Sequence, residues 1–531
     1  MLHHQNWKGC QKVCRLTYLL FLLVFIGCDN DAIQKRDITI EAFSTLKTPV
    51  FEMDSAEIRS VLKKMGQGMK DTLSPEGYIA QYYERGGNLL WIGRQGVTAM
   101  ADTLVQQLYT VNRIGFSDAY FKANEIEDYL QRFKALDFDQ QHTVSVVSAR
   151  LDYLLTRAYL TYVTGQYYGF VNPKSALNKT ESKPDSTGKV KVEYVNNYDV
   201  ALERPTSEFY ISSLRKIEND SVGDMIREVE PQSVLYHQLL RQLKDSATEA
   251  SRKRIMVNME RCRWREKKPM PSSGKRVVVN VPAFMLYAYG PDSTMEMRIG
   301  CGKTNTKTPL LTSEMEYMQI NPEWNIPQSI VDNEVLGHAG DSSYFARHRY
   351  YIAERSTGKK VPISSVSRAM LASGKYRVAQ DGGRGNSLGR IVFRFSNNHA
   401  VYLHDTSTPA FFQSDWRAVS HGCVRVQRPF DLARFLLGET DDWTLDKIRI
   451  SMDIPPVTSQ GKEYIRTHKP EEGENGRRLP QKLVSYMPIN PHVPIYITYY
   501  TLYPDRNGQI QSYPDVYGYD QSIWNHLKKY I

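Results

Sequence analysis

The sequence predicts an α+β protein of several domains, in which a mostly helical region precedes a β-rich domain. Between residues 54 and 167, and again over 207–265, apolar side chains recur three and four positions apart, which is the spacing of one buried helix face. From residue 275 the period becomes two, because Val277, Val279 and Val281 occupy every second position, as in a strand. The order of these two patterns predicts helices first and a sheet second.

These changes of pattern divide the chain into consecutive parts, and its length of 531 residues is compatible with about three domains. The polar stretch 172–205 predicts a loop or insertion. Residues 331–380 break the strand pattern with helical and turn segments, and strands return at 384–406. The expected parts are a targeting segment (1–28), a tether (29–53), a mostly helical scaffold domain (54–270), a β-rich domain (271–455) with its insertion at 331–380, and a C-terminal linker with strands that pack on that domain (456–531).

The N-terminal segment has the pattern of an export signal. Three basic residues, Lys8, Lys12 and Arg15, precede an apolar run of eleven residues, Leu16–Ile26. That run is too short to span a bilayer comfortably but fits the core of a signal peptide. It is followed by a glycine and Cys28, which look like a lipoprotein processing site at which the cysteine is acylated and holds the chain to a membrane. An uncleaved anchor and ordinary export are the alternatives, and all three predict a location outside the cytoplasm.

Composition excludes several kinds of site. The formal net charge is +10, but basic and acidic residues are mixed along the chain, so an anionic envelope surface is a better partner than nucleic acid. The six cysteines form neither a disulfide framework nor a CxxC pair with zinc spacing, and the pairing of Cys262 with Cys301 is left open. The glycines of 382–385 lack the Lys-Ser/Thr ending of a phosphate-binding loop. We therefore expect no metal, no cofactor and no nucleic acid.

The segment 402–425, YLHDTSTPAFFQSDWRAVSHGCVR, contains the candidate reactive residues. His404 stands nineteen positions before Cys423, and His421 and Gly422 lead directly into the cysteine. A thiol reacts as the thiolate, which a nearby imidazole helps to form, so the pattern indicates a cysteine nucleophile with a histidine base. Gly422 allows a sharp turn whose backbone N–H groups can face a developing oxyanion. The alternatives are a buried structural cysteine and half of a metal site.

The pattern H-x16-H-G-C-V-R resembles the catalytic signature of the YkuD-type L,D-transpeptidases. The residues that match this signature are Ser420, His421, Gly422, Cys423 and Arg425. Other segments resemble the large, multidomain, YcbB-like branch of that family, whose architecture is a helical scaffold domain followed by a β-rich catalytic domain. Those segments are 89–94 and 151–163 in the scaffold, and 276–289, 319–330, 384–393 and 494–520 in and after the catalytic domain.

The resemblance implies that Cys423 attacks a peptidoglycan tetrapeptide stem, releases its terminal D-alanine and passes the acyl group to the side-chain amine of a second stem peptide. His404 would act as general base and then as general acid. Arg425 would bind a substrate carboxylate, with a structural ion pair as the alternative. An envelope protein is a further candidate acceptor. Support for the oxyanion would come from residues around the nucleophile, namely His421, Gly422, Tyr402 and Ser420.

The same resemblance implies that residues 331–380 form a lid over the site, and that penems and carbapenems acylate Cys423. A surface insertion without gating is the alternative for 331–380. Two features depart from the branch: the lipoprotein site at Cys28, and His421, where other members often have serine. The run 239–264 also leaves no room for the small peptidoglycan-binding module that the branch usually contains.

Two other functions remain open. One is an exported cysteine hydrolase that trims stem peptides or releases wall-linked protein, and the other is a non-catalytic lipoprotein that tethers the membrane to the wall. Papain-like peptidases usually place the cysteine first, whereas here His404 precedes Cys423, and a pure binder has no use for a thiol beside an imidazole. Outside the signature, His338 and His399 are expected at the surface and Trp324 in the core.

Overall fold

The structure is a computed structural model that describes residues 49–69, 71–184, 190–291, 293–469, 472–473, 477–478 and 481–531. The predicted signal peptide, with Cys28, and the first part of the predicted tether lie outside these residues. The chain forms two compact units. The first unit contains the residues up to Tyr109, Phe121–Thr161 and Ser207–Met225, and the second contains Thr110–Tyr120, Tyr162–Thr206 and Ile226–Ile531.

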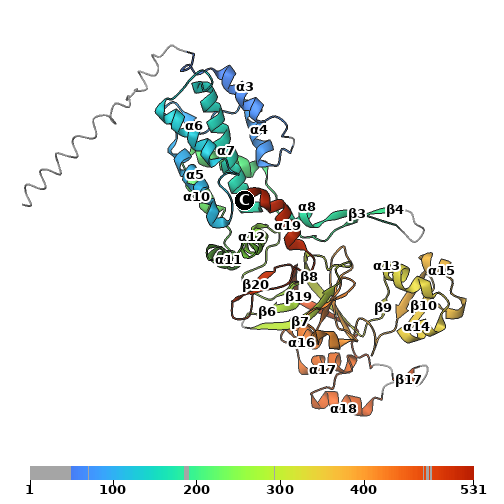
Figure 1. Ribbon diagram of the computed structural model, residues 1–531. Helices are drawn as coiled ribbons and strands as arrows, with labels where there is room; N and C mark the ends of the chain where they lie inside the picture. Colours follow the sequence, from blue (N-terminus) through green and yellow to red (C-terminus); the bar gives the residue numbers. More distant parts are fainter. Residues whose placement is uncertain are drawn as a thin grey trace, which may run out of the picture. The chain divides into compact units, whose positions relative to one another are not determined.

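The first unit is helical (Figure 1). Helix α7 is buried at almost every position from 144 to 161 and is therefore its central element. The fully buried carboxylate of Asp152 on α7 accepts hydrogen bonds of 2.8 Å from the N–H groups of Leu90 and Trp91, which ties the connection before α5 to α7. The elements are α3 (Ser55–Met65), α4 (Pro75–Glu84), β1 (Ile92–Gly93), β2 (Gly96–Val97), α5 (Ala99–Tyr109), α6 (Ala123–Ala135), much of α7 (Val144–Tyr168), α9 (Ser207–Glu218) and part of α10 (Val222–Glu228).

The second unit is built on a nine-stranded sheet in the order β15-β7-β16-β14-β13-β8-β19-β5-β6. An additional pairing of β6 with β7 closes the sheet on itself, so one face is inside and the other outside. Strand β19 lies in the middle of this order, parallel to β5 and antiparallel to β8. The strands are β5 (Arg276–Asn280), β6 (Met285–Tyr289), β7 (Thr294–Gly302), β8 (Leu311–Ile320), β13 (Ile391–Phe395), β14 (Leu403–His404), β15 (Ala418–Ser420), β16 (Val424–Val426) and β19 (Tyr486–Thr498).

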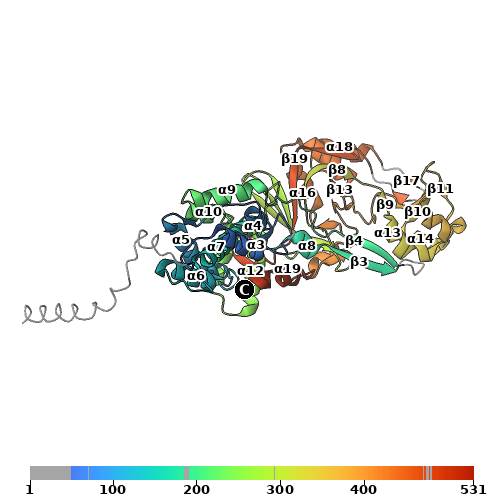
Figure 2. The ribbon, with the colours of Figure 1, turned by 90° about the horizontal axis from the view of Figure 1, so that it is seen from above.

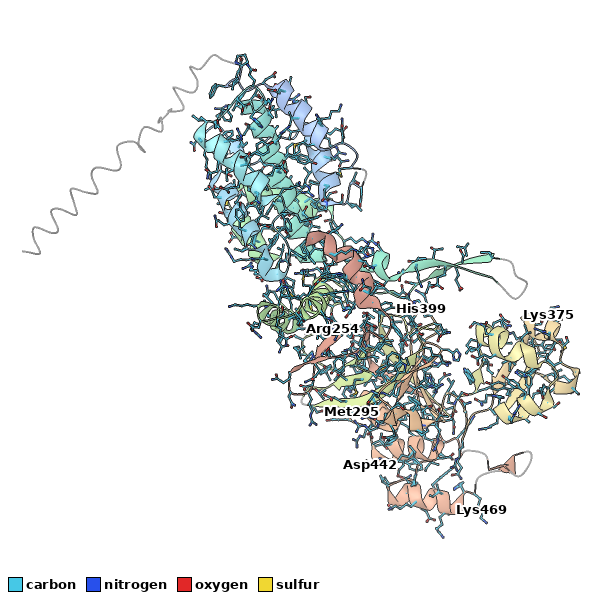
Figure 3. All side chains as sticks on the ribbon, viewed as in Figure 1. Arg254, Met295, Lys375, His399, Asp442 and Lys469 are labelled. Atoms are coloured by element: carbon cyan, nitrogen blue, oxygen red, sulfur yellow. The ribbon has the colours of Figure 1, made fainter. Side chains whose placement is uncertain are left out.

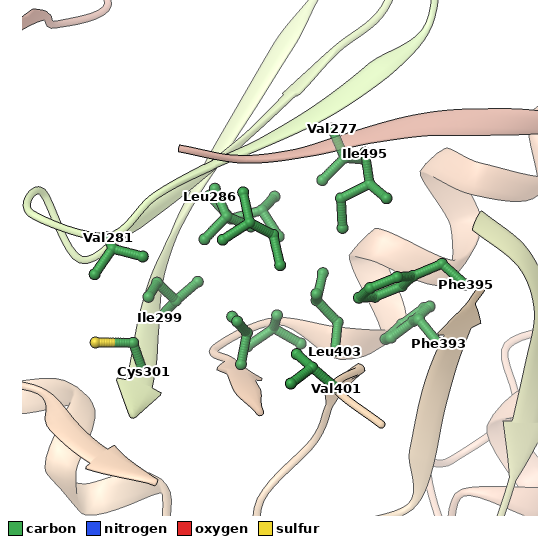
Figure 4. Packing of buried hydrophobic residues seen from close by; sticks show 14 of the residues in the cluster. Val277, Val281, Leu286, Ile299, Cys301, Phe393, Phe395, Val401, Leu403 and Ile495 are labelled. Atoms are coloured by element: carbon green, nitrogen blue, oxygen red, sulfur yellow. The ribbon is translucent and has the colours of Figure 1, made fainter. Parts of the chain in front are cut away.

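Apolar side chains fill the inside of this sheet (Figure 4). Val277, Leu286, Ile299, Leu403 and Ile495 come from five different strands, and all five are fully buried. Burial of such a side chain contributes about 1.5–3 kcal/mol relative to an exposed one. Helices α16 (Pro429–Leu437) and α17 (Asp442–Ser451) add further apolar residues to the same core. The predicted class, a helical region followed by a β-rich domain, is confirmed.

The insertion is a compact subdomain with a core of its own. Four short strands form a separate sheet in the order β11-β10-β12-β9. Its core includes Val331, Phe345, Ile352, Leu371 and Val378, all nearly or fully buried. We call this subdomain the lid. Its elements are β9 (Trp324–Asn325), α13 (Gln328–Ile330), the π-helical turn Val331–Val335, α14 (Ser342–His348), β10 (Tyr350–Glu354), β11 (Lys360–Val361), α15 (Arg368–Ala372) and β12 (Tyr376–Gln380).

Several elements of the second unit differ from the sequence prediction. The polar stretch that predicted a loop contains a hairpin, β3 (Lys179–Pro184) and β4 (Val190–Val195), which extends as a ribbon (Figure 2). The C-terminal segment, predicted as linker and strands, also contains helices α18 (Ser459–Thr467) and α19 (Tyr519–Leu527). Both helices are short and mostly polar in sequence, so neither gives a clear helical pattern of apolar residues. The remaining elements are α8 (Pro173–Leu177), α11 (Val234–Lys244), α12 (Glu249–Arg263), β17 (Glu472–Gly473), β18 (Arg477–Arg478), β20 (Leu502–Pro504) and β21 (Ile510–Ser512).

Only residues 245–248 separate α11 from α12, so no additional folded module lies between these helices. Across the described ranges, none of the helices combines the length and the apolar character that crossing a bilayer requires.

Candidate active site

Strand register brings the predicted reactive residues together. Strands β14 and β16 are parallel neighbours, with Leu403 opposite Val424 and His404 opposite Arg425. Side chains alternate along a strand, and both Leu403 and Val424 are fully buried in the inner core. His404 and Arg425 therefore project from the outer face, and Cys423, immediately before β16, belongs to the same set. The two ends of the signature thus meet on one outer face.

The turn that carries the thiol is held by hydrogen bonds from both sides. Ser420 Oγ donates to the carbonyl of Cys423 (2.6 Å) and accepts from the N–H of Gly422 (3.1 Å). Thr308 Oγ1 donates to the carbonyl of Gly422 (2.8 Å). Gly422 is buried and has a φ of +122°, a backbone conformation that side chains disfavour. The turn therefore has a fixed shape, and Ser420 acts on its backbone.

Cys423 is half-buried, and its Sγ lies 3.9 Å from the carbonyl oxygen of Ala400. Burial raises the pKa of the thiol, while hydrogen bonds from Tyr402 and the charges of Arg394 and Arg425 act in the opposite direction. Burial has the largest effect, so the resting thiol is protonated at neutral pH.

His404 is only 3% exposed, and its imidazole is neutral. Burial lowers its pKa to about 3, and the positive charge of Arg425 acts in the same direction. The carbonyl groups of Leu388 and Asp405 oppose this shift, but Nδ1 has no partner with hydrogen-bond geometry among the residues described. The Asp405 carboxylate instead accepts the N–H of Arg390 at 2.9 Å. His404 is therefore a neutral imidazole that can accept a second proton.

Arg425 has no acidic partner within the described ranges, and its buried Nε makes no hydrogen bond there. Its guanidinium carbon lies 5.7 Å from the centre of the Phe411 ring. Burial lowers the pKa of this guanidinium. The absence of a carboxylate partner among the described residues disfavours the structural ion pair and leaves the guanidinium fork available.

The lid contacts the site at two points. His421 Nε2 lies 2.6 Å from Glu334 Oε1, in the π-helical turn of the lid, and the two side chains are 37% and 51% exposed. Trp324, on strand β9, lies close enough to the Tyr402 hydroxyl to lower its pKa, although burial raises that pKa overall. The Tyr402 hydroxyl also contacts the Cys423 thiol. The structure thus places His421 against the lid, and the lid reaches the thiol through Tyr402.

Three residues at the site were not predicted from the sequence. Glu334 and Thr308 lie in polar segments that no local pattern distinguishes, and Trp324 was expected in the core, whereas it is half-buried at the edge of the lid. The sequence signal that could have marked Trp324 is its position as an aromatic residue between two prolines, in NPEWNIP. His338 is exposed as expected, but His399 (Figure 3) is half-buried, with Nε2 2.9 Å from an Asp199 oxygen, which corrects its assignment to the surface.

The two other cysteines in the described part of the chain take no part in this site. Cys262 and Cys301 are free thiols, and burial raises the pKa of each to about 12. No group of three or more His, Cys, Asp or Glu side chains in the described part of the chain could hold a metal ion.

Comparison with known proteins agrees with the geometry. Residues 274–453 match the family model of the L,D-transpeptidase catalytic domain, YkuD, and residues 77–243 match that of a scaffold domain. A Haemophilus influenzae protein named as a proposed L,D-transpeptidase is 27% identical over 341 residues, which cover 62% of this chain and 63% of that relative. The chain therefore combines a scaffold domain with a catalytic domain of the YkuD L,D-transpeptidase family, in a YcbB-like architecture.

Proposed function

We propose that the chain is a peptidoglycan L,D-transpeptidase that cross-links two stem peptides in the cell wall. The observation that carries this proposal is the placement of His404, Cys423 and Arg425 on one outer face of neighbouring strands. A base, a nucleophile and a carboxylate-binding group on one face are what acyl transfer between two peptides requires. The match to the catalytic-domain family supports the same reaction class.

In the first step Cys423 Sγ attacks the carbonyl of the third residue of the donor tetrapeptide. The S–C bond forms, the C–N bond to the terminal D-alanine breaks, and a thioester remains. His404 accepts the thiol proton and returns it to the amine of the departing D-alanine. The N–H of Cys423 and the Tyr402 hydroxyl stabilise the oxyanion, because the hydroxyl lies beside the thiol and the N–H of Gly422 is already donated to Ser420 Oγ.

In the second step the side-chain amine of another stem peptide attacks the thioester. His404 accepts a proton from this amine, the new amide forms, and the Cys423 thiol is regenerated. Water competes with the amine, so exclusion of water by the lid favours cross-linking over hydrolysis.

We place this reaction outside the cytoplasm, since the wall and its stem peptides are there. The predicted export signal supports this location, and acylation of Cys28 would hold the enzyme at a membrane. The net charge of +10 favours approach to anionic envelope surfaces. An envelope protein that presents an amine is an alternative acceptor for the same thioester.

The proposal is tested with residues 29–531 and a disaccharide-tetrapeptide, read by mass spectrometry. A cross-linked dimer with loss of D-alanine supports the transpeptidase. A tripeptide monomer alone instead identifies the exported hydrolase. The absence of any product leaves a wall-binding protein or an enzyme that requires a protein acceptor or an activating partner. Incubation with a carbapenem is expected to raise the intact mass by one drug molecule, and the Cys423→Ala variant serves as the control.

Replacing Arg425 by methionine is expected to raise KM for the donor about 10- to 100-fold with a smaller change in kcat, because charged hydrogen bonds to a carboxylate are lost. Initial rates over a range of donor concentrations measure both constants. Arg466→Met is the matched control, since Arg466 is exposed and its ion pair with Glu463 lies on α18, outside the site. An unchanged KM in Arg425→Met would assign Arg425 to structure alone.

Replacing Glu334 by glutamine removes the charge that faces His421 and is expected to loosen the lid. An exposed pair of this kind contributes up to about 1 kcal/mol, so the ratio of hydrolysed tripeptide to cross-linked dimer should rise by up to about fivefold. Glu354→Gln is the control, because Glu354 lies on lid strand β10 and bonds Thr357 within the lid. Equal product ratios in the two variants would show that the contact does not govern access of water.

A further inference from the structure

We propose that a groove on the outer face of the sheet, beyond Arg425, binds the sugar of the donor and thereby selects stem peptides that are still attached to the glycan. This inference rests on the proposed function and names the part of the substrate that the cysteine site does not contact. It is carried by strand register, by two adjoining cavities and by the free side chains that line them.

Strand register makes the groove continuous with the face of Cys423. Along β16 the outer positions continue from Cys423 through Arg425 to Gln427, whose Oε1 accepts the N–H of Arg298 on β7 (3.2 Å). From β7 the same face crosses to β6, where Tyr287 is opposite Glu296. The buried partners of these positions, such as Leu286 and Ile299, point into the inner core. Thiol and groove thus lie on the same face of the sheet, on which the segment Pro409–Gln413 packs beside Arg425 and Arg298.

Two cavities of about 530 and 510 Å³ lie on this surface. They share five lining residues, Met285, Tyr287, Glu296, Arg298 and Asp505, so they form one groove. The first reaches Gln427 and Arg506, and the second reaches Trp416. Each volume is within the range of small-molecule sites, about 300–1,000 Å³.

Aromatic rings and free carboxylates in the groove suit a sugar. Trp416 is 51% exposed and is supported by an edge-on contact with Phe284 (centroids 5.6 Å apart), so one indole face is available to a pyranose ring. The side chains of Glu296 and Asp415 form no hydrogen bond or ion pair with the described residues, and carboxylates accept hydrogen bonds from hydroxyl groups.

The charge of the groove favours a neutral ligand. Arg298 is engaged with the carbonyl of Phe412 (2.7 Å), and the carboxylate of Asp505 accepts hydrogen bonds from its own turn. Three arginines and three carboxylates line the groove, so neither sign of charge dominates; they are Arg298, Arg417 and Arg506, and Glu296, Asp415 and Asp505. The sugars of a stem-bearing disaccharide are neutral, because the lactyl carboxyl group forms the amide to the peptide.

The distance between thiol and groove fits the donor. Four residues of extended strand separate Cys423 from Gln427, which corresponds to about 13 Å. In the donor, three residues of stem lie between the sugar and the attacked carbonyl, and they span about 10–11 Å when extended. A stem that passes Arg425 with its third carbonyl at Cys423 therefore brings its sugar to the edge of the groove.

The kinetic test compares two donors, the disaccharide-tetrapeptide and the free tetrapeptide, through the ratio of their kcat/KM values. We expect the protein to prefer the disaccharide donor about tenfold and Trp416→Ala to bring the ratio close to one, because the stacking surface is lost. Glu296→Gln is a second variant, expected to lower the ratio in the same direction. Tyr194→Ala is the control, since Tyr194 is an exposed aromatic on β4, outside the groove, and should leave the ratio unchanged.

A binding test does not depend on turnover. The disaccharide of N-acetylglucosamine and N-acetylmuramic acid, with its lactyl carboxyl group converted to the amide so that the sugar is neutral, is titrated calorimetrically into Cys423→Ala and into the double variant Cys423→Ala/Trp416→Ala. Saturable heat in the first and its loss in the second support the groove. Equal kcat/KM for both donors, or identical titrations of the two variants, would overturn it. If neither donor is turned over, the proposed function fails, whereas the titration still decides the groove.

Discussion

Replacing Cys423 by alanine is expected to lower turnover by more than about a thousandfold, because the thiol that forms the acyl intermediate is removed. The fold should be unaffected, since the thiol is half-buried and the turn is held through the main chain by Ser420 and Thr308. Product formation followed by mass spectrometry and the midpoint of thermal unfolding measure the two effects.

Cys301→Ala is the matched control for this experiment. Cys301 is a fully buried thiol in the inner core, so its replacement should lower stability while turnover by the folded fraction persists. A Cys423→Ala protein that unfolds at much lower temperature would identify the cysteine as structural, and one that still forms the dimer would require another nucleophile.

Replacing His404 by alanine is expected to lower kcat/KM about 10²- to 10⁴-fold, as for loss of a general base. Because burial lowers the pKa of His404 to about 3 and raises that of Cys423, the resting pair is a neutral imidazole and a neutral thiol. Thiolate absorbance and alkylation of Cys423 by iodoacetamide should therefore rise only on the alkaline side of the usual thiol range. Substantial thiolate at pH 6–7 would reveal a preformed ion pair instead.

The lowered pKa of His404 also makes the stability of the fold sensitive to acid. In the unfolded chain the imidazole takes up a proton near pH 6.5, whereas in the folded protein it does so only near pH 3. Between these values the unfolded state binds more protons, so the free energy of unfolding should fall as the pH is lowered from about 6.5 towards about 3. His404→Gln should show a smaller decrease in denaturant titrations across this interval.

The reactive pair could be predicted from the sequence because its signal is local. A histidine, a fixed gap and a His-Gly-Cys run define His404 and Cys423, and the period of two defines their strands. Alternation along β14 and β16 then separates the core residues Leu403 and Val424 from the reactive ones. The roles of these residues stay predictions that the experiments above address.

The parts that could not be predicted depend on contacts between distant segments. Glu334 and His421 are in contact although they are 87 positions apart in the sequence, and Thr308 and Gly422, which share a hydrogen bond, are 114 positions apart. Nothing in the local sequence of either residue indicates its partner. Trp324 is large and apolar, so its residue type predicts a core position. Its place near Tyr402 follows from β9 being the edge strand of the lid sheet, which the sequence does not indicate.

The position of β19 has a consequence for the synthesis of the enzyme. This strand, Tyr486–Thr498, separates β8 from β5, so until it is made both neighbours have open edges and the sheet cannot close. Because the chain is synthesised from its N-terminus, His404 and Cys423 are made before the sheet that aligns them is complete. Activity begins only with a nearly finished polypeptide, and a chain shortened before Tyr486 would be inactive although it retains every residue of the signature.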